Sequence, residues 1–413
     1  MTASQSGRVR NIERIGIEVD MTEDDATSPI AGKKIAIVGA GPSGLTLARL
    51  LQMRGGSVTV YDLDPSLAAR NQGGSLDLHE ASGQLALKKA GLLDLFHAAA
   101  RPEGQATRVL DHHGKIYVDL RPSDETSTRP EIDRGTLQSI LFDSLEPGTV
   151  KWGRRLLSVE RNEGGGLCLR FADDTTEQAD LVFGSDGAWS RVRPMVSPDK
   201  PRYSDITFIE GRISAADTDW PDISRLVGEG AIMVTGDNRA ILAQRNSDGH
   251  IRLYACLRET EEWIARQAFD FTDPASVRTK LLAHYAGWSP EMLQMLTASD
   301  DQFVLRPIYT HEPTQHWTPQ PDVTLTGDAA HVMPPFTGKG VNLAMQDALE
   351  LADALTGGEH ADVASALRAY ESGMLARMEK EIRLVLHDQD IFVSPIAPQG
   401  VIELFEARLR GEG

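Results

Sequence analysis

The chain contains the stretch Gly327-Asp328-Ala329-Ala330-His331-Val332-Met333-Pro334-Pro335-Phe336-Thr337-Gly338-Lys339-Gly340-Val341-Asn342, which joins a carboxylate to a proline- and glycine-rich turn that opens a helix. Pro334 and Pro335 restrict the backbone of this turn and supply no N–H donors. A helix predicted over residues 341–355 would direct its positive end and its first N–H groups toward the space in front of the turn. The stretch therefore predicts a binding site beside Asp328, which we expect to be a buried carboxylate.

A strand, a helix and a second strand are predicted near the N-terminus. Residues 35–38 form a short apolar run, residues 45–51 carry apolar side chains at helical spacing, and residues 57–61 are rich in β-formers. Parallel strands require a crossover connection such as this helix. The fold class is therefore α/β.

The turn between the first strand and the helix carries Gly39, Gly41 and Gly44 in the spacing of a dinucleotide-binding motif. The first glycine permits the tight turn, the second lets the backbone approach a pyrophosphate, and the third allows helix and strand to pack closely. Asp62 follows Gly44 by 18 residues, where a ribose-binding carboxylate is expected. This context favours a bound dinucleotide over a glycine turn without a ligand.

The middle of the chain predicts a second sheet. Residues 151–184 contain short strands, and residues 202–303 contain β-prone runs separated by Gly, Asp and Asn clusters, which favours an antiparallel sheet. A strand over residues 323–326 returns to the first sheet. Helices are predicted after residue 134, where the apolar face is formed by Leu137, Ile140, Leu141 and Leu145, and over residues 363–386, where the long helix should lie across both sheets.

We accordingly predict a Rossmann-type domain interwoven with an antiparallel-sheet domain and a long C-terminal helix. The predicted division of the chain is 1–30 for a flexible N-terminal tail, 31–200 plus 304–356 for the discontinuous dinucleotide-binding domain, 201–303 for the substrate-binding domain, and 357–413 for a C-terminal helical segment.

Composition excludes several classes of partner. The 42 lysine and arginine residues against 60 acidic residues give a net charge of −18, which disfavours nucleic acid and anionic membranes as partners. Cys168 and Cys256 are too few for a disulfide framework, and there is no apolar run of transmembrane length. The 11 histidines show no HExxH pattern, so no metal site is expected. We expect a cytoplasmic protein, monomeric in solution.

Several motifs in order carry a family resemblance: Ile37-Val38-Gly39-Ala40-Gly41-Pro42-Ser43-Gly44-Leu45, Gly73-Gly74-Ser75-Leu76-Asp77-Leu78-His79, Ala90-Gly91-Leu92-Leu93, Glu131-Ile132-Asp133-Arg134, Ala179-Asp180-Leu181-Val182, Ser190-Arg191-Val192-Arg193, and the stretch from Gly327 to Asn342. The chain resembles the class A flavoprotein aromatic hydroxylases of the para-hydroxybenzoate hydroxylase fold, and within them the tetracycline-inactivating monooxygenases of Tet(X) type. The resemblance extends over residues 33–386.

The resemblance implies an FAD-dependent monooxygenase that uses NAD(P)H as reductant and O2 as oxidant. Such enzymes act through C4a-hydroperoxyflavin and hydroxylate an electron-rich aromatic or enolic molecule, here a polyketide or tetracycline-like compound. No side chain is expected to be an obligatory catalytic nucleophile.

The resemblance also implies roles for individual residues. Asp62 would bind the adenosine ribose, Arg134 the pyrophosphate or ribityl region, and Asp328 a ribityl hydroxyl. Asp77 would lie near the flavin ring, and Arg70 would contact the nicotinamide cofactor. The other residues expected to bind FAD are Gly39, Gly41, Gly44, Pro335, Gly338, Gly340, Val341 and Asn342.

The sequence departs from the tetracycline-inactivating pattern in several places. Leu63 stands where those enzymes have an arginine, so one adenosine contact is expected to be lost. Lys339 replaces a neutral residue and either faces the flavin N1 and O2 edge, where it would favour the anionic reduced flavin, or faces solvent.

The drug-binding positions of those enzymes differ as well. Glu210, Ala231 and Arg252 stand where they use glutamine, arginine and histidine, which weakens the case for tetracycline itself. The substrate pocket is predicted to be lined by Glu210, Arg212, Met233, Arg252 and Phe336 and to suit a polar fused-ring or phenolic compound.

Three other functions share features with this pattern. A flavin-dependent halogenase is disfavoured because no two tryptophans stand two residues apart. A flavin-dependent reductase of the same fold and a non-catalytic flavin- or ligand-binding protein stay open, because bound FAD alone does not prove turnover.

Overall fold

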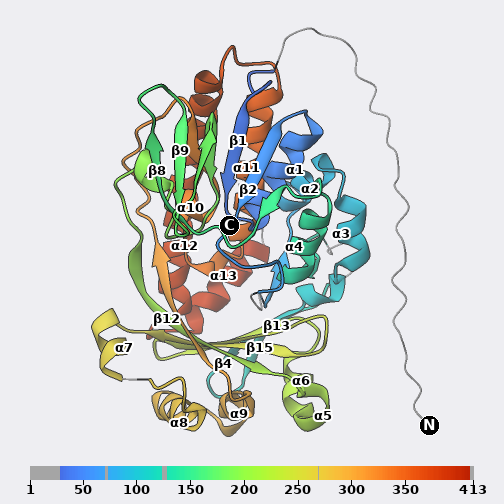
Figure 1. Cartoon of the computed structure of the whole chain (residues 1–413). Coiled ribbons are helices and arrows are strands. Elements are labelled where there is room, and N and C mark those ends of the chain that lie inside the picture. Colours follow the sequence, from blue (N-terminus) through green and yellow to red (C-terminus); the bar gives the residue numbers. More distant parts are fainter. Residues whose placement is uncertain (1–27, 70–72, 123–127, 268, 410–413) are drawn as a thin grey trace, which may run out of the picture.

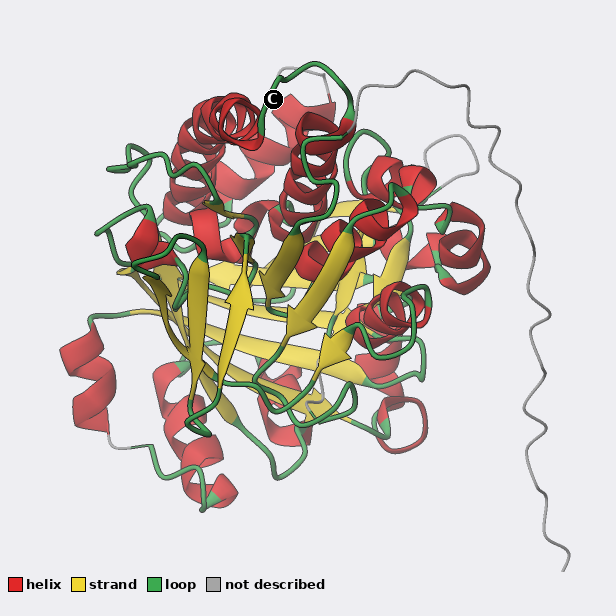
Figure 2. Ribbon diagram, turned by 45° about the horizontal axis from the view of Figure 1, so that its top comes forward, coloured by secondary structure: helices red, strands yellow, loops and turns green. Residues whose placement is uncertain are grey.

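The computed structural model describes residues 28–69, 73–122, 128–267 and 269–409. Two large sheets organise them (Figure 1). A parallel sheet with its helices occupies the upper part of the view, and a seven-stranded sheet lies below it with a group of helices on its far side. Figure 2 shows the same arrangement from a tilted direction, with helices above the strands and further helices below them. None of the described helices is long and apolar enough to cross a membrane.

The five-stranded sheet is parallel throughout. Its strands, in order across the sheet, are β17 (Val323–Leu325), β11 (Leu181–Gly184), β1 (Lys34–Val38), β2 (Ser57–Tyr61) and β7 (Val150–Lys151). The predicted βαβ unit is confirmed, because α1 (Pro42–Met53) connects β1 to β2. The predicted return of the chain to this sheet near residue 323 is also confirmed, since β17 pairs with β11.

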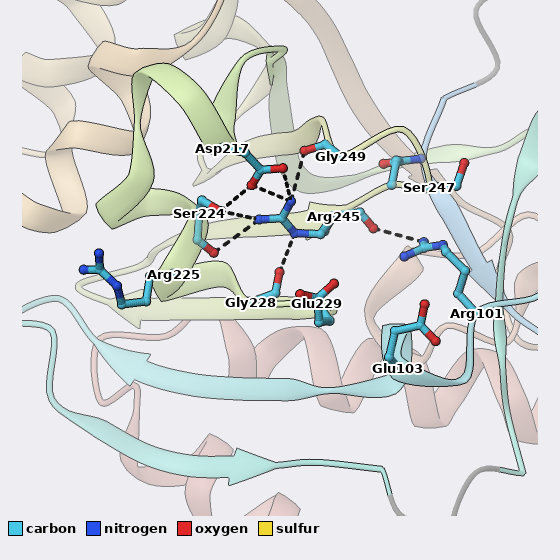
Figure 3. A pocket seen from close by; sticks show the side chains of 11 residues that line it. Arg101, Glu103, Asp217, Ser224, Arg225, Gly228, Glu229, Arg245, Ser247 and Gly249 are labelled. Carbon is cyan, nitrogen blue, oxygen red and sulfur yellow. Dashed lines mark hydrogen bonds and ion pairs between the residues drawn. The ribbon is translucent and has the colours of Figure 1, made fainter.

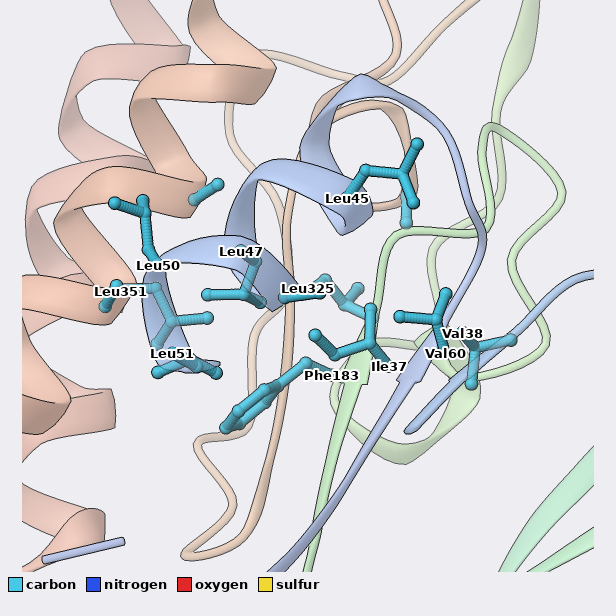
Figure 4. Close-up of a cluster of buried hydrophobic side chains, with 14 of the residues drawn as sticks. Ile37, Val38, Leu45, Leu47, Leu50, Leu51, Val60, Phe183, Leu325 and Leu351 are labelled. Carbon is cyan, nitrogen blue, oxygen red and sulfur yellow. The ribbon is translucent and has the colours of Figure 1, made fainter. Parts of the chain in front are cut away.

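The core of this region forms because β1 is covered on both faces, as its continuous apolar run requires. Figure 4 shows leucines of α1, among them Leu47 and Leu51, beside Ile37, Phe183 and Leu325 of the sheet, and all of these side chains are buried. Burying one such side chain contributes about 1.5–3 kcal/mol, so this cluster is a main source of stability. Further layers come from the small antiparallel sheet β8 (Leu156–Arg161), β9 (Leu167–Phe171) and β10 (Thr176–Ala179) and from helices α2 (Gly83–Lys89), α3 (Leu93–Ala99), α4 (Arg134–Asp143) and α11 (Gly340–Thr356).

The seven-stranded sheet is antiparallel except where β13 and β4 pair in parallel. Its strands, in order, are β16 (Val304–Thr310), β12 (Arg202–Ile213), β15 (Ile251–Arg258), β14 (Arg239–Arg245), β13 (Ala231–Gly236), β4 (Thr107–Asp111) and β5 (Ile116–Leu120). The antiparallel sheet predicted for residues 201–303 is present but larger, because β4, β5 and β16 come from outside that range. Strand pairing between segments this far apart in sequence leaves no local signal.

The two faces of this sheet differ. One face packs on α5 (Ala216–Asp219), α6 (Pro221–Val227), α7 (Glu261–Gln267), α8 (Pro274–His284) and α9 (Pro290–Ala298). In β12 the side chains of Ile209 and Ile213 point to that face, and those of Phe208 and Glu210 therefore point to the opposite face. The opposite face turns toward the C-terminal helices and the turn around Phe336.

The long helix α12 (Val363–Phe392) crosses both regions, as predicted. Its Met374 and Ile382 belong to the core beneath the parallel sheet, whereas Val385 and Phe392 pack with residues of the seven-stranded sheet. A further helix, α13 (Gln399–Leu409), follows it. The remaining short elements are β3 (Ser75–Asp77), β6 (Glu131–Asp133), η1 (Pro102–Gln105), η2 (Arg193–Met195), η3 (Pro335–Thr337) and α10 (Asp328–His331).

The prediction of a tail up to residue 30 is wrong at its end. Ile30 is 1% exposed and belongs to the core, where its side chain lies next to the turn at Gly56. A single apolar residue at the end of a polar segment gives no periodic signal, which is why its burial was missed. The rest of the predicted tail, residues 1–27, lies outside the described residues.

Candidate functional site

In the glycine turn between β1 and α1, Gly39 and Gly44 are tightly packed, whereas Gly41 borders open space. Gly39 has φ +105°, and a Cβ there would lie 2.2 Å from the carbonyl oxygen of Ser185. A Cβ at Gly44 would lie 2.0 Å from the carbonyl oxygen of Gly39. A Cβ at Gly41 would meet no described atom within 4 Å. The first and third glycines are therefore required by packing, and the second leaves room for a ligand at the positive end of α1.

Asp62 stands at the end of β2 and holds this turn. Its Oδ2 accepts a hydrogen bond from the backbone N–H of Ala40 at 2.7 Å, and its Oδ1 accepts one from that of Asp64 at 2.8 Å. The side chain is half-buried. Each carboxylate oxygen has a second lone pair, so a ribose hydroxyl could bind there; that role stays a prediction. Leu63 is 43% exposed.

The second motif begins where β17 ends. Gly327 has φ +60° and leads into the short helix α10. Asp328 is exposed, whereas Ala329, Ala330 and His331 are buried, so the expectation of a buried carboxylate is wrong. The apolar neighbours made Asp328 look buried in the sequence, but a one-turn helix buries only the sides that pack against the core. An exposed carboxylate is free to accept a ligand hydroxyl.

The two motifs are in direct contact. The Ser43 hydroxyl, in the first turn of α1, donates to the carbonyl oxygen of Ala344 at 2.8 Å, and its oxygen also lies 2.8 Å from the Thr326 hydroxyl. Thr326 Oγ1 also lies 2.7 Å from Ser185 Oγ at the end of β11. A Cβ at Gly327 would stand 3.4 Å from that of Ser43. The glycine turn and the Asp328 loop therefore lie side by side in the fold.

The proline-rich turn lies at the start of α11. Pro335 and Gly338 are exposed, Gly338 has φ +68°, and α11 begins at Gly340, next to the half-buried Val341. A Cβ at Gly338 would stand 3.2 Å from Asp77 Oδ1, so the turn faces Asp77. The structure thus brings these predicted residues to one place.

Asn342 joins this turn to β3. Its Nδ2 donates to the carbonyl oxygen of Asp77 at 2.8 Å, and its Oδ1 accepts from the backbone N–H of His79 at 2.8 Å. His79 Nε2 lies 2.9 Å from Asp77 Oδ2. The buried side-chain amide of Asn342 is therefore occupied by the backbone of Asp77 and His79, which leaves its own backbone N–H as the group that could face a cofactor.

Arg134 begins α4. Its backbone N–H donates to the carbonyl oxygen of Gly74 at 3.1 Å, and its half-buried guanidinium has no hydrogen-bond partner among the described residues. Gln138, one turn later, donates to the carbonyl oxygen of Ala40 in the glycine turn at 2.9 Å. Arg134 is thus close to the first motif with its donors uncommitted. Arg70 lies outside the described residues.

Lys339 makes an ion pair that neither interpretation of the sequence included, and its position relative to the flavin edge stays a prediction. Its Nζ pairs with the carboxylate of Glu381 on α12 at 2.9 Å, and its side chain is 32% exposed. An ion pair with an element far along the chain could not be foreseen from the neighbouring glycines.

The face of the seven-stranded sheet that carries Phe208 and Glu210, here called the inner face, holds a buried charge cluster. The Glu210 carboxylate is bonded by Arg252 Nη1 and, at 2.8 Å, by Arg306 Nε. The Nε and Nη2 groups of Arg252 are buried without a hydrogen-bond partner among the described residues. A side chain at Gly73 would overlap this guanidinium, so the cluster lies against the segment that leads into β3.

The other predicted substrate residues take different positions. Phe336 packs on Phe208, with ring centroids 6.1 Å apart, and Met233 contacts the same apolar cluster. Arg212 stands near the end of β12, where it is half-buried and pairs with Asp248 at 3.3 Å. Four of the five predicted residues therefore lie around the inner face, and the fifth lies at its edge.

Sequence reasoning missed two charged residues on this side. Arg306 belongs to β16, outside the range assigned to the sheet. Glu131 of β6 is buried, accepts a hydrogen bond from Gln244 Nε2 at 3.2 Å, and burial raises its pKa to about 7. Glu131 stands in the quoted motif next to Arg134, and that proximity was the available signal.

A surface cavity of about 520 Å³ lies at another place (Figure 3). Arg245 stands at its centre and donates to Asp217, Ser224, Gly228 and Gly249, so its guanidinium is saturated. None of the predicted cofactor or substrate residues lines it. We regard it as a polar surface recess rather than the reaction site. The described residues contain no cluster of three or more His, Cys, Asp or Glu side chains suited to a metal.

Known proteins match this chain over most of its length. The family model for an FAD binding domain matches residues 33–384. Monooxygenase asqM of Emericella nidulans is 31% identical over 373 residues, covering 78% of this chain and 83% of that protein. Monooxygenase penA of Penicillium thymicola is 30% identical over 411 residues, covering 86% and 94%.

Solved structures share the fold. Klebsiella pneumoniae HpxO complexed with FAD and uric acid has a TM-score of 0.75 at 22% identity and covers 93% of this chain and 94% of its own. The tetracycline destructase Tet(55) has a TM-score of 0.70 at 20% identity, with coverage of 93% and 96%. The likeness to tetracycline-inactivating enzymes therefore concerns the fold alone. The matched family and the two fungal relatives show that the chain belongs to the FAD-binding-domain family of flavin-dependent monooxygenases and is an FAD-dependent oxidoreductase.

Proposed function

We propose that the protein binds FAD between the glycine turn and the Asp328 loop and uses NAD(P)H and O2 to hydroxylate an electron-rich aromatic or enolic small molecule. The observation that carries this proposal is the contact between the two motifs through Ser43 and Thr326. An extended dinucleotide that spans both motifs needs the two loops side by side, and this contact supports that arrangement.

The residues present fit this cofactor. The open backbone at Gly41, at the positive end of α1, suits a pyrophosphate. Asp62 would hold the adenosine ribose, the uncommitted guanidinium of Arg134 would bind the pyrophosphate or the ribityl chain, and the exposed Asp328 carboxylate would accept a ribityl hydroxyl. Each assignment needs a free donor or acceptor, and each of these groups has one.

The turn from Pro335 to Val341 would face the pyrimidine edge of the flavin. The start of α11 supplies N–H groups and the positive end of a 17-residue helix, which favour negative charge at that edge. Bound FAD supplies the redox and oxygen chemistry itself. The chain's task is to hold the ring, stabilise charge beside it and keep water out.

The substrate would lie between this turn and the inner face of the seven-stranded sheet. Phe208, Phe336 and Met233 offer apolar surface, and the Glu210 and Arg252 pair adds a polar end, where two guanidinium nitrogens have no hydrogen-bond partner among the described residues. Buried donors without partners favour a ligand oxygen that carries negative charge. A phenolate or enolate of polyketide type has both features, and a tetracycline-like compound is one member of that class.

The test uses purified full-length protein. We expect a yellow protein with bound FAD whose NAD(P)H oxidation rises with some member of a panel of phenols, polyketides and tetracycline, together with a product one oxygen atom heavier. NADH and NADPH are supplied in separate arms. A reductase would instead give a product two hydrogens heavier, and a sequestering protein would bind ligand without consuming O2. Either outcome, or a panel that leaves NAD(P)H oxidation unstimulated, contradicts the hydroxylation proposal.

A further inference from the structure

The orientation of Asp328 depends on how the short helix α10 is held. Asp328 is its single exposed residue, and the other three are buried. A helix of four residues has almost no stability of its own, because nucleation is unfavourable and few hydrogen bonds form. Its geometry must therefore come from the groups that surround it.

One buried carboxylate bonds both ends of this helix. Asp347 on α11 is 0% exposed. Its Oδ2 accepts a hydrogen bond from the backbone N–H of Gly327 at 2.9 Å and lies 2.5 Å from His331 Nε2. Gly327 precedes Asp328 and His331 ends α10, so a single oxygen atom fixes the residues on both sides of Asp328.

Asp347 is itself held in place by α12. Its Oδ1 accepts a hydrogen bond from Arg377 Nη2 at 2.8 Å, and Arg377 also binds Glu350 at 2.7 Å. Burial by itself raises the pKa of Asp347, but His331 and Arg377 outweigh this effect and lower it, so the carboxylate is ionised. An ionised acceptor makes stronger hydrogen bonds than a neutral one.

The opposite side of α10 is held by another cation. The buried guanidinium of Arg193 donates to the carbonyl oxygens of Ala329 and Ala330, each at 3.0 Å. The helix is thus bound on two sides, and these bonds leave the Asp328 side chain directed outward.

We propose that Asp347 is a positioning residue for FAD, which fixes the Gly327 amide and His331 and thereby sets the Asp328 carboxylate for the ribityl chain. This inference rests on the proposed placement of FAD at Asp328. The competing explanation is that Asp347, His331 and Arg377 form a buried ionic cluster that serves stability alone.

The test measures FAD affinity of the deflavinated full chain by flavin fluorescence, with the melting temperature of each apoprotein recorded by circular dichroism. Asp347→Asn is expected to weaken FAD binding by roughly tenfold or more, because the amide cannot accept from both ends of α10 with the same strength. Glu350→Gln is the matched control, since it removes a charge from the same Arg377 cluster without contacting α10. It should leave the Kd within about twofold of wild type.

A second pair of variants covers the case in which Asp347→Asn does not fold. His331→Gln keeps an N–H donor near the position of Nε2 and should retain FAD affinity, whereas His331→Leu removes the donor and should weaken it. Equal effects of the two His331 variants, or equal effects of Asp347→Asn and Glu350→Gln, would overturn the inference. Asp328→Ala distinguishes failure of the proposed FAD site from failure of the positioning role of Asp347. If this variant leaves FAD affinity unchanged, the proposed cofactor site itself is wrong.

Discussion

Replacing Gly41 by alanine should separate cofactor binding from folding. The added Cβ would meet no described atom within 4 Å, and the backbone of Gly41 at φ −76° is allowed for alanine. Alanine is a poorer N-cap than glycine by about 0.5 kcal/mol. Alanine also lowers the entropy of the unfolded chain, which stabilises the folded state by about 0.4–1 kcal/mol. The unfolding free energy of the apoprotein should therefore stay within about 0.5 kcal/mol of wild type.

The same methyl group should weaken FAD binding. The second glycine of this motif is the position where the backbone approaches the pyrophosphate, so a Cβ there displaces the phosphate from the N–H groups at the start of α1. We expect the Kd for FAD to rise by roughly tenfold or more, equivalent to about 1.4 kcal/mol.

Gly44→Ala is the matched control, because its Cβ would lie 2.0 Å from the carbonyl oxygen of Gly39. Backbone must move to relieve that overlap, which costs about 1–3 kcal/mol of folding stability. Urea unfolding of both apoproteins and fluorescence titration with FAD give the comparison. The reasoning fails if Gly41→Ala binds FAD as tightly as wild type, or if it destabilises the apoprotein as much as Gly44→Ala does.

Three further changes test other parts of the structure. Glu210→Gln removes the counter-charge of the buried Arg252 and should destabilise the apoprotein by about 3–5 kcal/mol in urea unfolding. Lys339→Met breaks the pair with Glu381 and should cost under about 1 kcal/mol, with no change in the flavin midpoint potential measured by dye equilibration; a fall in potential would mean that the lysine acts on the flavin. The pKa of Glu131 is raised from 4.5 to about 7, so between these pH values the folded chain keeps a proton that the unfolded chain loses. The unfolding free energy should therefore fall by up to about 3 kcal/mol as the pH rises from 4.5 to about 7. Glu131→Gln should abolish this fall, and parallel pH profiles for the two proteins would contradict it.

Local patterns allowed much of the fold to be predicted. The glycine turn, its flanking strands and the start of α4 at Arg134 each depend on residues within one supersecondary unit. The long helix α12 was foreseen because its apolar periodicity extends over many turns. These are features that a short window of sequence determines.

Other features depend on contacts between distant segments and could not be predicted. The parallel pairing of β13 with β4 joins residues more than 100 positions apart, and Arg306 reaches Glu210 from a strand that begins after the predicted sheet range. The exposure of Asp328 depends on the buried groups that hold α10, and those groups come from α11 and the segment before β12. Composition and periodicity carry no information about such pairings.

Helix α11 explains how these separate segments make one site. Asn342 binds the backbone of β3 beside Asp77, and Asp347 binds the turn that carries Asp328. The two residues are five positions apart, a rise of about 7.5 Å along a helix axis. Because a helix is rigid over this length, one element sets the separation between the proposed flavin-ring side and the proposed ribityl side of the site. The Lys339 and Arg377 ion pairs attach that element to α12, which also packs on the seven-stranded sheet. The same pair of helices therefore positions both the proposed substrate face and the proposed cofactor loops. Oxygen transfer from a bound ring to a bound substrate would require such fixed relative positions.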